Sequence, residues 1–183
     1  MKNKIGLIVE GKTDKKFFES YFKKQFGFTK NMIVLPSGTG NTCKIMNERT
    51  IKGKIEDLRD KNCSEIYILL DLDSKCKKDI YHCVKELKDD YINKLNLLHE
   101  TDVKVIVVSS EIEAWMLSAW KKSDKKTKED LKKEFAIKSN SNIEEVLLQK
   151  FIKLQEDINP ENNHSLCYFL KKLGIIKAEY TCK

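Results

Sequence analysis

The segment Ile66-Tyr-Ile-Leu-Leu-Asp-Leu-Asp73 decides the fold, because an apolar run of strand length ends there at two carboxylates. Two other runs have the same form: Ile5–Val9 leads to Glu10, and Val103–Val108 is followed by Glu111-Ile-Glu113. Short β-branched and aliphatic runs are typical of parallel strands buried on both faces. The functional crevice of an open α/β sheet lies beyond the carboxyl ends of its strands. We therefore expect these acidic residues to gather at one edge.

Segments with a helical pattern alternate with the apolar runs. We expect strands over 4–9, 32–35, 65–71 and 103–108, and helices over 13–26, 42–60, 76–98 and from about 111. This alternation predicts a three-layer α/β fold with a Rossmann-like sheet of about four parallel strands, over residues 1–120. Beyond Trp120 the pattern becomes Lys-rich and helical, which predicts a helical C-terminal extension over 121–183.

Composition excludes several classes of protein. Of the 183 residues, 40% are hydrophobic and 34% are charged, which is typical of a soluble globular protein. No apolar run approaches membrane-spanning length, so we expect no membrane partner, and without a signal-peptide core we expect a cytoplasmic protein. The six cysteines form no CxxC pair, which argues against a zinc site and favours reduced, packed thiols.

The acidic residues at the strand ends indicate a metal site. Asp71 and Asp73 are two residues apart at a strand end, so their side chains project from the same side. Clustered carboxylates repel one another unless a cation neutralises them, and oxygen ligands favour Mg²⁺, with Mn²⁺ as a substitute. Asp14 can join this site or complement the dipole of its helix. Glu111 and Glu113 can bind a second cation or serve as first-turn acids of a helix.

Two other segments have both a structural and a functional interpretation. Aromatic residues recur along the expected helix 13–26, a spacing that favours a core stripe over a platform for stacking bases. The loop Pro36–Asn41 contains two glycines, so its amides can meet a phosphate or simply close a tight turn.

Basic residues predict contact with nucleic acid. The formal net charge is +7, and the stretch Lys121–Lys138 alone carries eight Lys against four acids. A basic surface near an acidic metal site attracts polyanions, although a Lys-rich solvated face is the alternative. We expect residues 121–138 to be exposed, with few apolar anchors. The candidate contacts are Lys12, Lys121, Lys122, Lys125, Lys126 and Lys128.

Two motifs together resemble the TOPRIM domain. They are Val9-Glu-Gly-Lys-Thr-Asp14-Lys-Lys-Phe-Phe18 and, downstream, Leu69-Leu-Asp71-Leu-Asp73. TOPRIM domains occur in topoisomerases, DnaG-type primases, RecR-like repair proteins, small ribonucleases and OLD-family nucleases. The resemblance covers about residues 1–120. The segment Ser109–Leu117 is similar to the element after the last strand in small stand-alone TOPRIM proteins, which, like the OLD-type and RloB-like groups, are associated with phage defence.

The resemblance implies a Mg²⁺-dependent nuclease that cleaves DNA or RNA. By this resemblance Glu10 is the general acid or base, Asp71 and Asp73 hold Mg²⁺, and Glu111 or Glu113 supports a second cation. The chain shows no ATPase domain and no Tyr-bearing topoisomerase domain. We therefore expect no strand passage, and any ATP dependence requires a separate ATPase subunit.

Three alternatives remain at this point. Gly6–Thr13 matches the Walker A pattern, with Asp71 as a Walker B acid, but its Leu-Ile-Val core is itself strand-like. A haloacid-dehalogenase phosphatase also uses Asp-x-Asp, although from its first strand. A TOPRIM module without activity, binding nucleic acid or a partner ATPase, is the third alternative.

Overall fold

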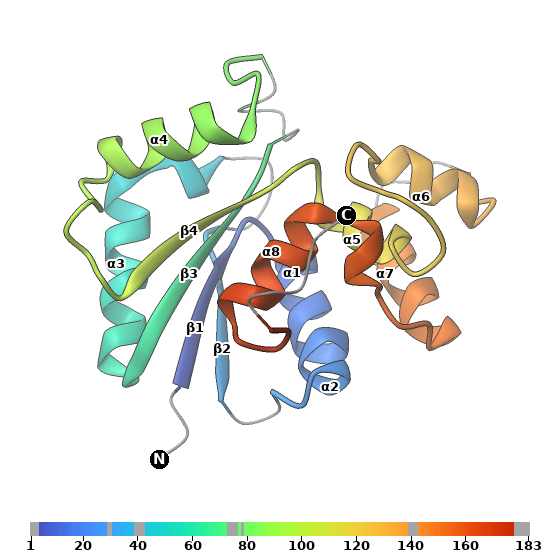
Figure 1. Cartoon of the computed structure of the whole chain (residues 1–183), viewed down its shortest axis with the longest axis horizontal. Helices are drawn as coiled ribbons and strands as arrows, with labels where there is room; N and C mark the ends of the chain where they lie inside the picture. Colours follow the sequence, from blue (N-terminus) through green and yellow to red (C-terminus); the bar gives the residue numbers. More distant parts are fainter. Residues whose placement is uncertain are drawn as a thin grey trace. The chain divides into compact units, whose positions relative to one another are not determined.

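The computed structural model describes residues 4–28, 31–38, 43–72, 77, 79–138 and 143–177 (Figure 1). The chain divides into two compact units, Met1–Val107 and Val108–Lys183, and each is described by itself. The sequence pattern suggested a boundary at residue 120. The structure instead assigns the helix Ile112–Leu117 to the second unit, because its apolar face packs among the C-terminal helices.

The sheet has four parallel strands in the order β2-β1-β3-β4. This arrangement confirms the expected α/β Rossmann-like class. The register places Ile8 beside both Leu35 and Ile68, so β1 is bonded on each side. The strands are β1 (Lys4–Val9), β2 (Met32–Pro36), β3 (Cys63–Asp71) and β4 (Val103–Val108).

Helices cover both faces of the sheet, as Figure 1 shows, with α1 and α2 on one side and α3 and α4 on the other. Because parallel crossovers are right-handed, strands added in opposite directions from β1 place their helices on opposite faces. The helical elements are α1 (Lys12–Phe17), the π-helical turn η1 (Phe18–Phe22), α2 (Lys23–Gln25), the 3₁₀ turn η2 (Lys44–Met46), α3 (Glu48–Asp60) and α4 (Val84–Lys94).

The helix α4 is shorter than the sequence pattern suggested. It begins at Val84 rather than near 76, because Cys83 is extended (φ −151°) and acts as the N-cap. The backbone N–H of His82 donates to Glu86 Oε2 at 2.8 Å, which satisfies a donor just before the helix.

The core beneath α3 and α4 is apolar and tightly packed. Alternate β3 residues Ile66, Ile68 and Leu70 are buried there against both helices. Gly6 of β1 lies so close to α3 that a Cβ atom would come within 2.7 Å of Leu58 Cδ1. The glycine of the Walker-like pattern thus has a packing role in the sheet.

The aromatic stripe of the first helical segment belongs to the core. Phe17, Phe18 and Phe22 are fully buried, and Tyr21 is 8% exposed. The rings of Phe18 and Phe22 are 5.0 Å apart between centroids, within the range of favourable ring contacts. The core interpretation of this stripe is confirmed.

A charge cluster closes the amino end of the sheet. Arg59, in the last turn of α3, forms two hydrogen bonds of 2.9 Å to Asp102 and one of 2.5 Å to Glu100. The bond from Arg59 holds the pKa of Asp102 below its usual value, against the smaller opposing effect of burial. The cluster joins α3 to the turn before β4 and is therefore structural.

The second unit is helical and has a substantial core of its own. Its elements are α5 (Ile112–Leu117), α6 (Lys128–Glu134), α7 (Ile143–Leu154), η3 (Pro160–Asn162) and α8 (His164–Lys172). Trp115 stacks on Phe169 at 5.4 Å and donates to Ser165 Oγ at 2.9 Å. No helix among the residues that the structure describes is long and apolar enough to cross a membrane.

Apolar anchors also lie within the Lys-rich stretch 121–138. Leu131 is fully buried and Phe135 is 5% exposed, so the expectation of a mostly unanchored, exposed segment is wrong at these positions. The reason is that α6 has only seven residues, and two apolar residues four apart suffice to attach it.

The cysteines differ from the expectation of uniformly reduced thiols. Cys63 and Cys83 are free, whereas Cys43 and Cys167 are disulfide-bonded. Cysteine spacing did not indicate this, because a disulfide depends on which thiols the folded chain brings together.

Candidate functional site

The candidate site lies where the strand order reverses. The chain moves from β1 to β2 on one side and later returns to place β3 on the other side of β1. In open α/β sheets such a switch point opens a crevice at the carboxyl ends of the two strands. Glu10 follows β1 directly and Asp71 ends β3, so both predicted residues lie at this point.

Glu10 is held in place by both neighbouring strands. Its Oε1 atom accepts a hydrogen bond from the backbone N–H of Asp71 at 2.8 Å. Its backbone carbonyl accepts one from Ser37 Oγ at 2.9 Å, just beyond β2. The side chain of Glu10 is 19% exposed, so a ligand can still reach it. The structure thus brings together Glu10 and Asp71, as the sequence predicted.

A lysine that sequence reasoning missed completes this arrangement. Lys77 is fully buried, and its ammonium forms an ion pair with Glu10 Oε1. Among the described residues, Glu10 Oε2 has no hydrogen-bond partner. No sequence signal distinguished Lys77, because it lies in a run with Lys75 and Lys78 and no periodicity marks it as buried.

Asp14 acts as a helix cap. Its Oδ2 atom accepts from the backbone N–H of Gly11 at 2.9 Å, at the start of α1. This position in the first turn of α1 fits the structural alternative in which Asp14 complements the dipole of its helix. Asp73, the second acid of the Asp-x-Asp motif, lies outside the described residues.

The Walker-like pattern does not form a phosphate loop. A P-loop needs free amides between its first glycine and the helix. Here Gly6 to Val9 belong to β1 and are paired with β2 on one side, and Gly6 to Ile8 also pair with β3. Lys12, the lysine of the pattern, is exposed in the first turn of α1.

Glu111 and Glu113 belong to the second unit, where Lys128 lies close to both. Glu111 Oε2 accepts the backbone N–H of Lys128 at 2.8 Å and so caps α6, while Glu113 is 7% exposed. Lys128 Nζ lies 2.8 Å from Glu144. Burial opposes the charge of Lys128, but the hydrogen bond to Glu144 and the charges of Glu144, Glu111 and Glu113 together raise its pKa. Lys128 is therefore a structural cation.

Within the residues that the structure describes, no group of three or more His, Cys, Asp or Glu is placed to hold a metal ion. The described part of the crevice supplies two carboxylates, Glu10 and Asp71. Mg²⁺ in phosphate-transfer sites is commonly bound by one or two carboxylates, with water and substrate phosphates as the other ligands. The donors present fit that mode of binding.

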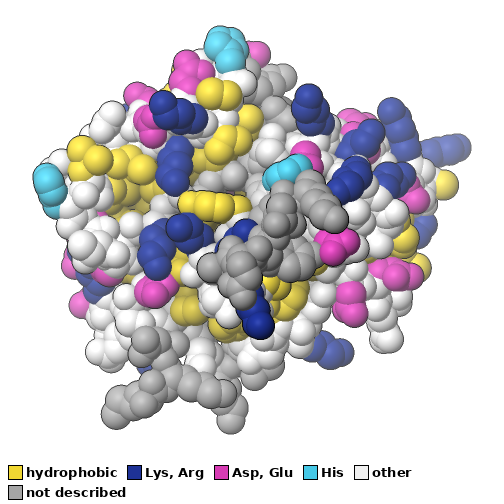
Figure 2. Space-filling model, viewed as in Figure 1, with side chains coloured by type: hydrophobic (Ala, Val, Ile, Leu, Met, Phe, Trp, Pro, Cys, Tyr) yellow, Lys and Arg dark blue, Asp and Glu magenta, His cyan; other side chains and the backbone are white. Residues whose placement is uncertain are grey.

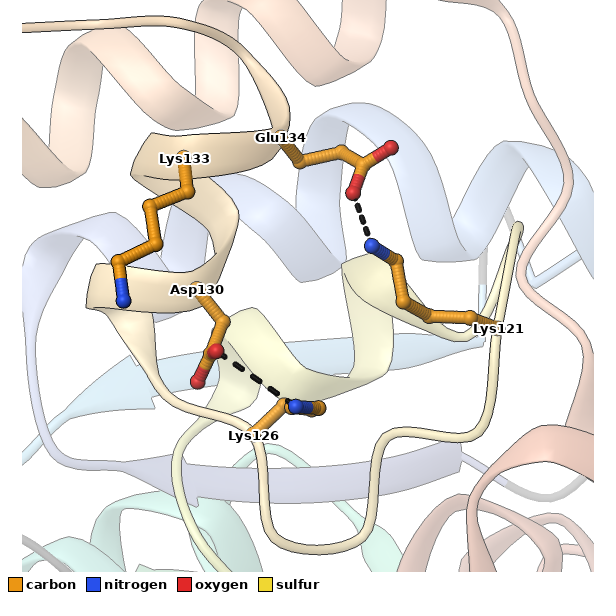
Figure 3. Close-up of a pocket in the computed structure, with 5 residues that line it drawn as sticks. All are labelled: Lys121, Lys126, Asp130, Lys133 and Glu134. Atoms are coloured by element: carbon orange, nitrogen blue, oxygen red, sulfur yellow. Dashed lines mark hydrogen bonds and ion pairs between the residues drawn. The ribbon is translucent and has the colours of Figure 1, made fainter.

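Two of the predicted nucleic-acid lysines are paired with acids. Lys121 is paired with Glu134, and Lys126 lies 3.6 Å from Asp130 (Figure 3). Lys122 Nζ donates to the backbone carbonyl of Glu161. Figure 2 shows Lys and Arg side chains gathered over the side of the molecule that carries α6. Five residues line an open pocket of about 340 Å³ there: Lys121, Lys126, Asp130, Lys133 and Glu134.

Lys125 and Lys133 form no ion pair within 4 Å among the described residues. Lys125 was predicted from sequence as a nucleic-acid contact, whereas Lys133 was not. Lys132, the neighbour of Lys133, differs from it in exposure and pairing: Lys132 is only 12% exposed and lies 2.5 Å from Glu129. The helical spacing of the acids around α6 decides which cation remains available.

No curated protein and no solved structure matches this chain. One family does, and its match spans residues 9–181, which includes the crevice residues Glu10, Asp71 and Lys77 as well as Glu111 and Glu113. The chain therefore belongs to the family described as a domain of unknown function (DUF4276).

Proposed function

We propose that this protein is a Mg²⁺-dependent nuclease that cleaves phosphodiester bonds of DNA or RNA. The observation that carries the proposal is the placement of Glu10 and Asp71 at the switch point of the sheet, joined by the 2.8 Å hydrogen bond. The resemblance of their motifs to the TOPRIM domain supports the same reaction. The P-loop alternative is disfavoured because Gly6 to Val9 are paired in the sheet, so their amides do not form a phosphate loop.

The residues of the crevice would have different roles in the reaction. When bound, Mg²⁺ would neutralise charge on the phosphate and make water a better nucleophile. Asp71 would hold the cation, together with Asp73. Glu10, fixed through Oε1, would present Oε2 to bind the cation and to accept or donate a proton. The role of Glu111 or Glu113 at a second cation rests on the resemblance alone.

The wider context of the proposal also rests on the resemblance. Small TOPRIM proteins of the OLD-type and RloB-like groups suggest a role in phage defence, with any ATP dependence supplied by a separate ATPase subunit. In the non-catalytic alternative the protein is a module that binds nucleic acid or a partner. The lysines of α6 would then contribute to binding, and no metal-dependent cleavage would occur.

Metal binding is the first test. Calorimetry with Mn²⁺ should show binding to the wild-type protein and its loss in Asp71→Asn, because the substitution removes one of the two described carboxylates. Asp57→Asn is a control that removes the same charge elsewhere. Asp57 is an exposed acid of α3 whose carboxylate lies 3.9 Å from Lys54. Equal binding by Asp71→Asn and the control would contradict the site assignment.

The surface of α6 gives a second test. Lys133→Gln should weaken nucleic-acid binding and reduce the salt slope by about 0.7–0.9, the value for one phosphate contact. Lys132→Gln, one residue earlier, should change the slope little because Lys132 is paired with Glu129 and nearly buried. Binding measured across a salt series checks both variants. Equal slopes for Lys133→Gln and the wild type would show that the pocket is only a solvated face.

A further inference from the structure

The burial of Lys77 is unusual for its chemistry. Lysine is almost never fully buried unless its charge is paired, because removing an ammonium from water costs several kcal/mol. Lys77 has 0% exposure, and its ammonium is paired with the carboxylate of Glu10. That carboxylate uses one oxygen, Oε1, for both Lys77 and the N–H of Asp71. This fully buried cation is thus directed at the residue to which we assign the chemistry.

We propose that the ammonium of Lys77 is a resident cation of this site. It holds Glu10 in place when no metal is bound, and it lowers the affinity of the site for a divalent cation. The inference rests on the proposed function, because it concerns the same metal site. Lys77 is a positioning residue here, since it acts through Glu10.

The charges of the crevice explain both effects. Glu10 and Asp71 carry one negative charge each, and Lys77 carries one positive charge, so the described groups sum to −1. Without Lys77 they would sum to −2 and would attract a divalent cation more strongly. The ammonium also repels such a cation across the partly buried carboxylate, where charges are screened less than in water. The ammonium that holds Glu10 in place without metal therefore also weakens metal binding.

A thermal-unfolding cycle in EDTA tests the pairing without any metal. Lys77→Met keeps the straight side chain and removes the charge, so Glu10 loses its buried partner and the melting temperature should fall by about 6 °C or more. Glu10→Gln combined with Lys77→Met should recover most of that fall, because a neutral amide needs no ammonium. Effects that simply add would overturn the inference.

Calorimetry with Mn²⁺ tests the effect on the metal. Lys77→Met should bind Mn²⁺ at least about fivefold more tightly than the wild type, whereas Lys77→Arg keeps the charge and should bind like the wild type. Unchanged or weaker binding by Lys77→Met, beside a wild type that binds, would overturn this inference alone. If neither protein binds Mn²⁺, the proposed metal site itself fails, and the effect on affinity fails with it.

Discussion

Replacing Glu10 with Gln should lower metal-dependent cleavage of nucleic acid by about 10²–10⁴-fold, the usual contribution of a general acid–base group. The amide is nearly the same shape as the carboxylate, and its oxygen can still accept the N–H of Asp71. The loss would therefore reflect the missing charge, which also leaves the buried Lys77 without its charged partner, and the missing proton transfer. Cleavage of a labelled DNA or RNA with Mg²⁺ or Mn²⁺, compared with the wild type, measures it.

Lys12→Ala is the matched control for this prediction. Lys12 lies two residues from Glu10 and is the lysine of the Walker-like pattern, yet it is exposed at the start of α1. Its removal should leave cleavage within a few-fold of wild type. The P-loop alternative would be favoured if the protein hydrolysed ATP, if Lys12→Ala abolished that hydrolysis, and if Glu10→Gln left nucleic-acid cleavage unchanged.

The second large effect concerns stability, in the second unit. Trp115→Ala should reduce the free energy of unfolding by about 3–5 kcal/mol, the usual cost of deleting a buried large aromatic side chain. Trp115 is fully buried, stacks on Phe169 at 5.4 Å and donates its indole N–H to Ser165 at 2.9 Å. The substitution leaves a cavity and removes the donor to Ser165 at the same time.

Trp115→Phe is the corresponding control, since it keeps most of the ring and loses the N–H donor. Trp115→Phe should reduce the free energy of unfolding by about 1–2 kcal/mol less than Trp115→Ala does, because the phenyl ring keeps part of the packing. Its stability should therefore lie between those of the wild type and Trp115→Ala. Hydrogen exchange resolved by mass spectrometry should show faster exchange across α8 in Trp115→Ala. Unchanged protection of α8 would mean that Trp115 does not anchor this helix.

These two predictions reflect different parts of the chain. The first depends on residues at strand ends, which sequence reasoning located directly. The second depends on a packed helical core in the second unit, which the Lys-rich sequence beyond residue 120 obscured. Trp115 lies before that stretch, in a segment that the sequence pattern grouped with the sheet.

The sequence by itself determined the fold class and the proximity of Glu10 and Asp71, the central pair of the candidate site. Alternating apolar runs and helical segments specify parallel strands, because each run is too short for a helix and carries β-branched residues on both faces. Parallel strands all end at the same edge, so residues following β1 and β3 must lie near each other. Glu10 and Asp71 were therefore predictable from local pattern alone.

Only the tertiary structure decided which charges are paired. Lys77 lies 67 positions from Glu10 along the chain, and Lys128 is 16 positions from Glu144, so no local pattern relates them. Periodicity reports which face of an element is apolar, whereas the partner of a charged side chain depends on contacts between distant elements. For that reason the sequence located the acids of this site, and the folded chain alone revealed the lysine that holds one of them.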